Sequence, residues 1–441
     1  MANMVDYLAW RGDVSFDLSP WNEVDALLFA TLSYLNFHGL QDQRGWTLRE
    51  ARRIDLLIES TGNTFERRKK MFESMAETAR FGEIRLHHFI ALTDEDISMQ
   101  FSAECADLPD GTMAVIFRGT DNTLVGWRED FNMSCQTRVP GQQAAAYYLL
   151  KAARHSDRPI RVIGHSKGGN LSVYAAASVP EWVQNRIESI WSFDGPGLNQ
   201  EVARSEGYER IRGKIHSYIP QTSIIGLLME YFRPYTVVRA AAKGLEQHDP
   251  MTWQVYGTHF EEMESIDRTA TVTCESLHEL LTNSTPEQRA TFVDTLFRLA
   301  DNTNATRMSD ILNEKFRSLV KMSTGTRELD PETLRVFRQL AKQAVSLGVG
   351  NFVEHVRRKS EQDGPDEWST MDADEAEKFK SSRKAAAELP ARRFRMRRPG
   401  RKADEKPETE EPSGTEEKSG TAEKPETEEK SKSDIDKKPD V

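Results

Sequence analysis

Cysteine is scarce in this chain, which has only three (Cys105, Cys135 and Cys274) in 441 residues. Three scattered thiols are too few for a disulfide framework or a cysteine-based metal site, so they indicate a reducing compartment. Long apolar runs are missing as well, because no window approaches the roughly 18 apolar residues that a membrane span needs. The stretch from Met1 to Arg11 lacks the positive start and apolar core of a signal peptide. We therefore expect a cytoplasmic protein without a transmembrane segment.

An excess of positive charge is also absent. The formal net charge is -11 at pH 7, which argues against nucleic acid as a specific partner. The length of 441 residues exceeds what a single hydrophobic core usually supports, and predicts two or three units.

What the chain does contain is a strand-like apolar run, Pro159–Ile163, that leads directly into Gly-His-Ser-Lys-Gly at 164–168. A helix pattern rich in small residues follows and ends before Pro180. This order matches the G-x-S-x-G nucleophile elbow, in which a serine occupies a sharp strand-to-helix turn. Ser166 is therefore the candidate nucleophile. The alternative is an ordinary serine in a tight turn between a strand and a helix.

A second strand-like run, Met113–Phe117, is followed by Arg118, Gly119 and Thr120. A serine hydrolase needs a second N–H donor for its oxyanion, and this donor comes from the loop after an earlier strand. Thr120 is placed for that role through its backbone N–H, with its hydroxyl as a further candidate donor.

These two segments resemble those of a known family. Phe117-Arg118-Gly119-Thr120, with Trp127 and Asp130 downstream, resembles the oxyanion segment of class 3 lipases, and the run from Gly164 to Gly169 resembles their nucleophile box. The closer resemblance is to the bacterial Mbeg-like family, which the segments 6–12 and 247–253 also resemble. It covers roughly residues 4 to 260. It implies an α/β-hydrolase fold and hydrolysis of acyl esters, without naming the substrate.

The chain departs from class 3 lipases at Lys167, where they usually have a hydrophobic residue or glutamine. The resemblance implies that the backbone N–H of Lys167 is the other oxyanion donor. We expect its ammonium to be solvated, and the alternative is recognition of an anionic substrate such as a phospholipid head group.

Further strand patterns continue on both sides of the elbow. Alternation at 83–92 and 98–103 predicts two strands, and His87 and His88 are expected to face opposite sides of the first. Strands are also expected at 189–193, 214–220 and 236–240, separated by connections of helical length. The fold class expected is therefore α/β, with a mainly parallel sheet flanked by helices.

The general base is expected on a loop after a late strand, because the usual order is serine, acid, histidine. His248 meets this condition. Its rivals are His216, which lies inside a strand pattern, and His259. His165, inside the elbow itself, is assigned a packing role.

The acid is harder to place. Class 3 lipases carry it in a loop whose counterpart here, 219–225, holds no carboxylate, and Ser223 occupies the matching position. Asp194, on the loop after the preceding strand, is the candidate that we adopt. The alternative is a dyad in which Ser223 or a backbone carbonyl orients His248.

Three regions complete the organisation. We expect a hydrolase domain at 1–260, a helical appendage at 261–360 with a helix starting near Pro286, and a disordered charged tail at 361–441. The apolar run 224–229, with Tyr231 and Phe232, is either a lid or acyl-chain surface or a helix packed on the sheet. A basic run at 392–398 is either a solvated tract or a contact with anionic lipid or nucleic acid.

Together these patterns predict a serine hydrolase of carboxylic esters with a lipid-like substrate. Ser166 would attack, His248 would move the proton, Asp194 would orient the imidazole, and the Thr120 and Lys167 amides would hold the oxyanion. This chemistry requires no metal and no cofactor. The alternative is a lipase-fold binding or scaffold protein with little or no catalysis.

Overall fold

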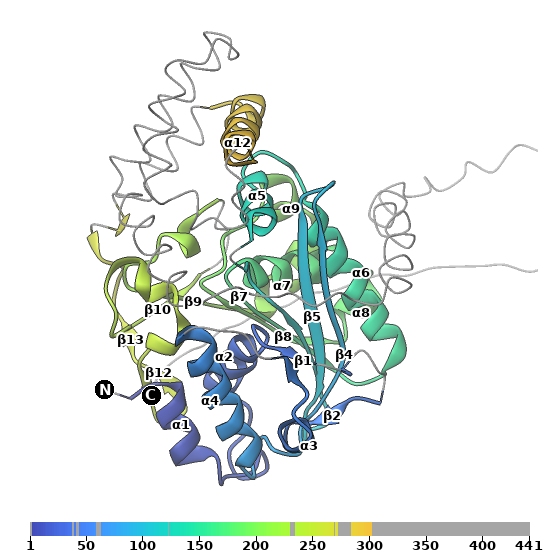
Figure 1. Ribbon diagram of the computed structural model, residues 1–441, viewed down its shortest axis with the longest axis vertical. Coiled ribbons are helices and arrows are strands. Elements are labelled where there is room, and N and C mark those ends of the chain that lie inside the picture. Colours follow the sequence, from blue (N-terminus) through green and yellow to red (C-terminus); the bar gives the residue numbers. More distant parts are fainter. Residues whose placement is uncertain are drawn as a thin grey trace, which may run out of the picture. The chain divides into compact units, whose positions relative to one another are not determined.

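The computed structural model describes residues 2–301, apart from 38, 41–43, 59–62, 122, 230–233, 269 and 272–283 (Figure 1). All of these residues lie within one compact unit, Met1–Phe394. The expected charged tail, and the expected appendage beyond residue 301, lie outside the described residues. The predicted domain limits therefore remain predictions.

A nine-stranded sheet forms the centre of the described structure (Figure 1). Its five middle strands, β6 to β10, run parallel to one another. The strands on either side are antiparallel. In order across the sheet they are β13 (Glu262–Met263), β10 (Thr236–Val238), β9 (Ile215–Pro220), β8 (Ile187–Phe193), β7 (Ile160–His165), β6 (Met113–Phe117), β5 (Met99–Asp107), β4 (Arg85–Asp94) and β2 (Trp46–Thr47).

The expectation of a mainly parallel sheet is therefore corrected to a mixed one. The reason is the length of two connections. Only 95–98 separate β4 from β5, and only 108–112 separate β5 from β6. Connections this short can close only an antiparallel pair, since a parallel pair needs a crossover of a dozen residues or more. The predicted strands themselves are present.

Helices cover both faces of the sheet, and successive residues of each central strand point to opposite sides. On β6, Ile116 joins the core beneath α1, α2 and α4, and Val115 joins the core beneath α6 and α7. The helices are α1 (Met4–Arg11), α2 (Glu23–Leu32), α3 (Leu48–Arg53), α4 (Asn63–Glu77), α5 (Leu124–Asn132), α6 (Pro140–His155), α7 (Lys167–Ser178), α8 (Glu181–Gln184), α9 (Gln200–Ala203), α10 (Glu206–Ile211) and α12 (Pro286–Asp301).

Small pieces complete the described elements. β1 (Asn36–Phe37) pairs with β3 (Leu57–Ile58), and β11 (Val255–Tyr256) pairs with β12 (His259–Phe260). Short 3-10 helices are η1 (Arg212–Lys214), η2 (Ile225–Leu227), η3 (Gly244–His248) and η4 (Pro250–Thr252). No helix in the part of the chain that the structure describes combines the length and the apolar character needed to cross a bilayer.

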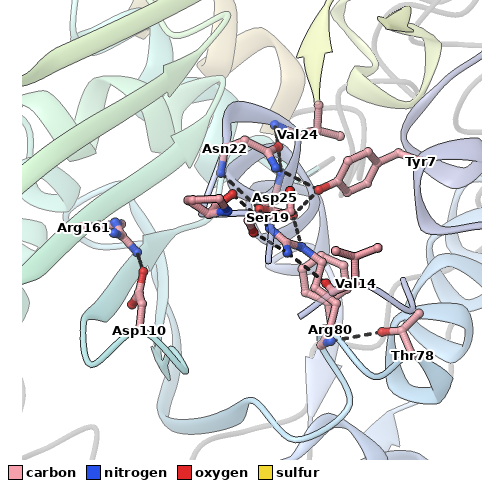
Figure 2. A network of polar contacts seen from close by, with 12 residues as sticks. Tyr7, Val14, Ser19, Asn22, Val24, Asp25, Thr78, Arg80, Asp110 and Arg161 are labelled. Carbon is pink, nitrogen blue, oxygen red and sulfur yellow. Dashed lines mark hydrogen bonds and ion pairs between the residues drawn. The ribbon is translucent and has the colours of Figure 1, made fainter. Parts of the chain in front are cut away.

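A buried ion pair organises the N-terminal helices (Figure 2). Arg80 and Asp25 form a two-pronged contact, with Nε to Oδ1 at 2.9 Å and Nη2 on Oδ2, and both side chains have no exposed surface. The hydroxyl of Tyr7 donates to the same carboxylate at 2.8 Å. Arg80 also donates to the carbonyl oxygens of Val14, Ser19 and Pro20. A single guanidinium thus donates hydrogen bonds to backbone carbonyl oxygens of the irregular segment between α1 and α2.

The expectation that His87 and His88 face opposite sides is wrong. The pairing of β4 with β5 shifts between His87 and Ile90, and His88 has a φ of 56°. This irregularity removes the strict alternation of side chains. The two imidazoles consequently face one another, with Nδ1 atoms 2.5 Å apart.

Candidate functional site

Ser166 lies between β7 and α7, at the sharp turn that its motif predicts. Its φ of 58° and ψ of -130° fall in a region that side-chain-bearing residues rarely adopt. Two flanking glycines explain how the turn closes. A Cβ at Gly164 would lie 2.1 Å from the carbonyl oxygen of Gly168, and one at Gly168 would lie 2.1 Å from that of Phe117. Any side chain at either position would therefore force strand and helix apart.

The structure brings His248 and Asp194 into direct contact. The Nδ1 atom of His248 lies 2.6 Å from Oδ2 of Asp194. The carboxylate is 1% exposed, whereas the imidazole is 26% exposed. A carboxylate accepts, so Nδ1 carries the proton and donates it, and Nε2 of the neutral ring is left as an acceptor. That arrangement suits a general base.

Asp194 is held by its own backbone and by Ser223. It follows β8 with a φ of 47°, and its N–H donates to the carbonyl oxygen of Tyr218 at 2.8 Å. Ser223 donates its hydroxyl to Oδ1 of Asp194 at 2.5 Å and accepts the N–H of Gly226 at 2.9 Å. Ser223, which stands where class 3 lipases carry their acid, thus donates a hydrogen bond to the carboxylate of Asp194. It is Asp194, and not Ser223, that contacts Nδ1 of His248.

His165 does more than the packing that we predicted. It is 3% exposed, and it joins the elbow to the loop of His248. Its Nε2 lies 2.8 Å from the carbonyl oxygen of His248, and its Nδ1 lies 2.8 Å from the hydroxyl of Tyr34. Because a carbonyl only accepts, Nε2 carries the proton and Nδ1 accepts from the tyrosine. The His165 and His248 rings are 4.6 Å apart between centroids. Nothing in the sequence pointed to Tyr34.

The rival histidines lie elsewhere. His216 belongs to β9 and stacks on Trp191 with ring centroids 4.3 Å apart. Burial lowers the pKa of His216, and Glu23 acts in the opposite direction. His259 lies on β12 with its Nδ1 3.5 Å from a carboxylate oxygen of the same Glu23. Asp249, next to His248 in the chain, forms an ion pair with Arg67, with Oδ2 and Nη1 3.1 Å apart.

Thr120 is anchored through its side chain. Its hydroxyl donates to Oδ2 of Asp130 at 2.5 Å, which leaves the backbone N–H as the candidate oxyanion donor. Burial raises the pKa of Asp130 to about 6, although the Lys167 charge and the Thr120 hydroxyl both act to lower it. Asp121 is a turn residue, because its Oδ1 accepts the N–H of Thr123 at 3.0 Å.

The expectation for the side chain of Lys167 is wrong in both of its forms. The residue is 1% exposed, so its ammonium is neither solvated nor available to a substrate head group. Nζ donates to the carbonyl oxygen and to Oε1 of Gln100, each at 2.7 Å, and to Oε2 of Glu129 at 3.0 Å. Glu129 directly precedes Asp130, but a carboxylate on a helix looks the same in sequence whether it faces solvent or core.

The apolar run 224–229 forms a single 3-10 turn, η2, rather than a helix packed on the sheet. Ile224, Ile225 and Leu227 are partly exposed, and the carbonyl of Leu228 accepts the N–H of Gly197 at 2.8 Å. The run adjoins Ser223 and therefore Asp194. Tyr231 and Phe232 lie outside the described residues. Across the described ranges there is no cluster of three or more His, Cys, Asp or Glu arranged to hold a metal ion.

Comparisons with known proteins point to one family. The family model described as Mbeg1-like matches residues 75–298, which is more than half of the chain. A search of curated proteins gives no match. Among solved structures, the crystal structure of M37 lipase is similar over 46% of this chain and 69% of that chain, with 18% identity and a TM-score of 0.29. A likeness at that TM-score supports no conclusion about the chemistry of this chain.

Proposed function

The chain belongs to the Mbeg1-like family, and we propose that it is a serine hydrolase of carboxylic esters with an α/β-hydrolase-like fold. The contact between His248 and Asp194 carries this proposal. The two residues come from loops 54 positions apart. The elbow contacts both loops, because the N–H of Ser166 donates to the carbonyl oxygen of Phe193 and the ring of His165 lies 4.6 Å from that of His248. The backbone of Ser166 is strained in the way that a nucleophile elbow requires.

The chemistry follows from these positions. Ser166 Oγ attacks the ester carbonyl while Nε2 of His248 takes its proton, and Asp194 holds the imidazole and stabilises its charged form. The negative oxygen of the tetrahedral intermediate binds to the Thr120 and Lys167 amides. His248 then gives the proton to the departing alcohol, which leaves an acyl group on Ser166. Water hydrolyses this acyl-enzyme by the same steps, and the free acid is released.

The partly exposed apolar side chains at 224–228 support a substrate with an apolar acyl portion. They border the loop of Ser223 and Asp194, so an acyl chain bound against them would lie beside the reacting carbonyl. A lipid-like ester is therefore the class of substrate that we propose.

Substitution Ser166→Ala tests the proposal. The purified full chain should hydrolyse p-nitrophenyl butyrate and react with a fluorophosphonate probe, and the variant should do neither, since the activated hydroxyl is gone. Ser15→Ala, in the segment between α1 and α2, is the matched control and should keep both properties. Equal turnover by wild type and Ser166→Ala would refute the proposal. A wild type that neither turns over nor labels would favour the alternative of a binding protein.

A further inference from the structure

We infer that Glu129 is a positioning residue for the oxyanion hole, and that it acts through the ammonium of Lys167. This inference rests on the proposed function. Lys167 has two relevant groups. Its backbone N–H is the first of α7, and the first N–H groups of a helix have no partner within that helix. Its side chain runs the other way, into the protein interior.

The side chain of Lys167 has no freedom left. An ammonium has three protons, and three acceptors surround this one: the carbonyl oxygen of Gln100, its side-chain oxygen, and Oε2 of Glu129, at 2.7, 2.7 and 3.0 Å. A long flexible side chain is thereby fixed at its far end. Because the ammonium end is fixed, the side chain also restrains the Cα and the backbone N–H of Lys167.

Glu129 ties this anchor to three other elements. Its Oε1 accepts the N–H of Gly141 at 2.6 Å, at the start of α6, and its Oε2 also accepts the N–H of Gln100 at 3.1 Å, on β5. A Cβ at position 141 would lie 2.8 Å from Oε1, so this approach needs glycine. Glu129 itself belongs to α5. Strand β5 and helices α5, α6 and α7 therefore meet at one carboxylate, which is 0% exposed.

Stability alone does not account for a charged pair at this place. Taking two charges out of water offsets much of their attraction, and well-packed apolar side chains often stabilise a protein equally well. What an apolar pair lacks is direction. Hydrogen bonds to a buried ammonium define where it lies, whereas a methionine in the same space has several rotamers. The neighbouring residue of α5, Asp130, holds Thr120 on the other side of the hole. One helix thus anchors both proposed donors.

The variants Lys167→Met, Glu129→Gln and the double variant separate positioning from stability. Each single variant leaves one buried charge or donor without its partner, so both lower the melting temperature. In the double variant neither member of the pair is charged, so the melting temperature recovers in part. The recovery is incomplete because both oxygens of Glu129 accept backbone N–H groups, from Gly141 and Gln100, and an amide NH2 cannot replace both of them. Lys151→Met on the exposed surface of α6 is the matched control, and it should leave stability and turnover unchanged.

Turnover is expected to behave differently. All three variants should lose ~10- to 100-fold in kcat for p-nitrophenyl butyrate, part of the ~10²- to 10³-fold that losing a whole oxyanion donor costs. The KM should stay within about two-fold, because the effect falls on the transition state. A trifluoromethyl ketone, whose adduct with Ser166 places a negative oxygen in the hole, should bind more weakly by the same factor as kcat.

Two results would overturn the inference. One is a double variant whose kcat recovers together with its melting temperature. The other is a folded single variant with the kcat of the wild type. Both presuppose a wild type whose turnover depends on Ser166. A Ser166→Ala variant that stays active would remove the proposed function itself, and is thereby distinguished from failure of this inference alone.

Discussion

Two buried ion pairs in this protein have similar burial but different surroundings. Arg80–Asp25 and Lys167–Glu129 are both at most 1% exposed, and each cation has several acceptors. The partners of Arg80 come from the chain around α1 and α2, and every polar atom of this pair has a partner (Figure 2). The polar atoms of Lys167 and Glu129 also have hydrogen-bond partners, but those of two neighbouring residues are not all paired. In the described part of the chain, Nε2 of Gln100 and Oδ1 of Asp130 are buried without a hydrogen-bond partner.

The difference teaches what each network is for. A closed network around a guanidinium stabilises an irregular segment that has few regular hydrogen bonds of its own. A network with unsatisfied atoms costs stability, and such sites concentrate where geometry is selected for function. We therefore expect substitutions around Lys167 to lower turnover as well as stability, and substitutions around Arg80 to lower stability alone.

Asp194→Asn should give the largest effect, and it probes the elbow side of the comparison. An asparagine can donate its amide to Nδ1 of His248 and so hold the imidazole in the wrong tautomer. We expect kcat for p-nitrophenyl butyrate to fall by about 10⁴-fold. The melting temperature should change little, since Ser223 still has an acceptor at Oδ1. Turnover within ten-fold of the wild type would show that another group orients His248.

Asp25→Asn is the matched change on the other side. It leaves the Arg80 charge buried without its carboxylate, and breaking such a pair costs about 3–5 kcal/mol. The melting temperature should fall by about 10 °C, while kcat per folded molecule stays at the wild-type value. Calorimetry together with active-site titration by a fluorophosphonate measures both quantities. A loss of kcat without a loss of stability would erase the distinction between the two networks.

Much of the fold was predictable from the sequence, because the central strands are short apolar runs that end at turns. Met113–Phe117 is confirmed to the residue as β6, and the helix start near Pro286 is confirmed as α12. The mixed character of the sheet follows from connection lengths, which strand patterns taken one at a time do not reveal. The bulge at His88 could not be predicted, since alternation says nothing about where a strand gains a residue.

The site divides in the same way. Ser166 was visible because its glycines have a local cause, the close crossing of strand and helix. Asp194 was predicted from topology, since it and His248 each follow the carboxyl end of a parallel strand, β8 and β10, and the structure places them in contact. Lys167 was misjudged because burial of a charged side chain depends on a distant partner. Neither Glu129 nor Gln100 has a local pattern that marks it as that partner.

Substitutions on the side of α5 that contacts α12 should have the smallest effects on stability and turnover. Helix α12 lies next to α5 (Figure 1). Arg128 forms an ion pair with Asp294 of α12 at 2.9 Å, and Phe131 contacts Phe297 of the same helix with ring centroids 6.1 Å apart. The ion pair is partly exposed, and such pairs contribute about 0–1 kcal/mol. Arg128→Gln should therefore lower the melting temperature by no more than a few degrees.

Its effect on kcat is the more informative measurement. If Glu129 and Asp130 alone set the position of α5 against the oxyanion hole, kcat should remain within about two-fold of the wild type. An Asp294→Asn variant should behave in the same way, and the double variant should add nothing. A kcat that fell in all three variants while the melting temperature held would mean that α12 helps to hold α5 in register. The set of residues that position Lys167 would then extend beyond Gln100 and Glu129, to a helix more than 100 residues further along the chain.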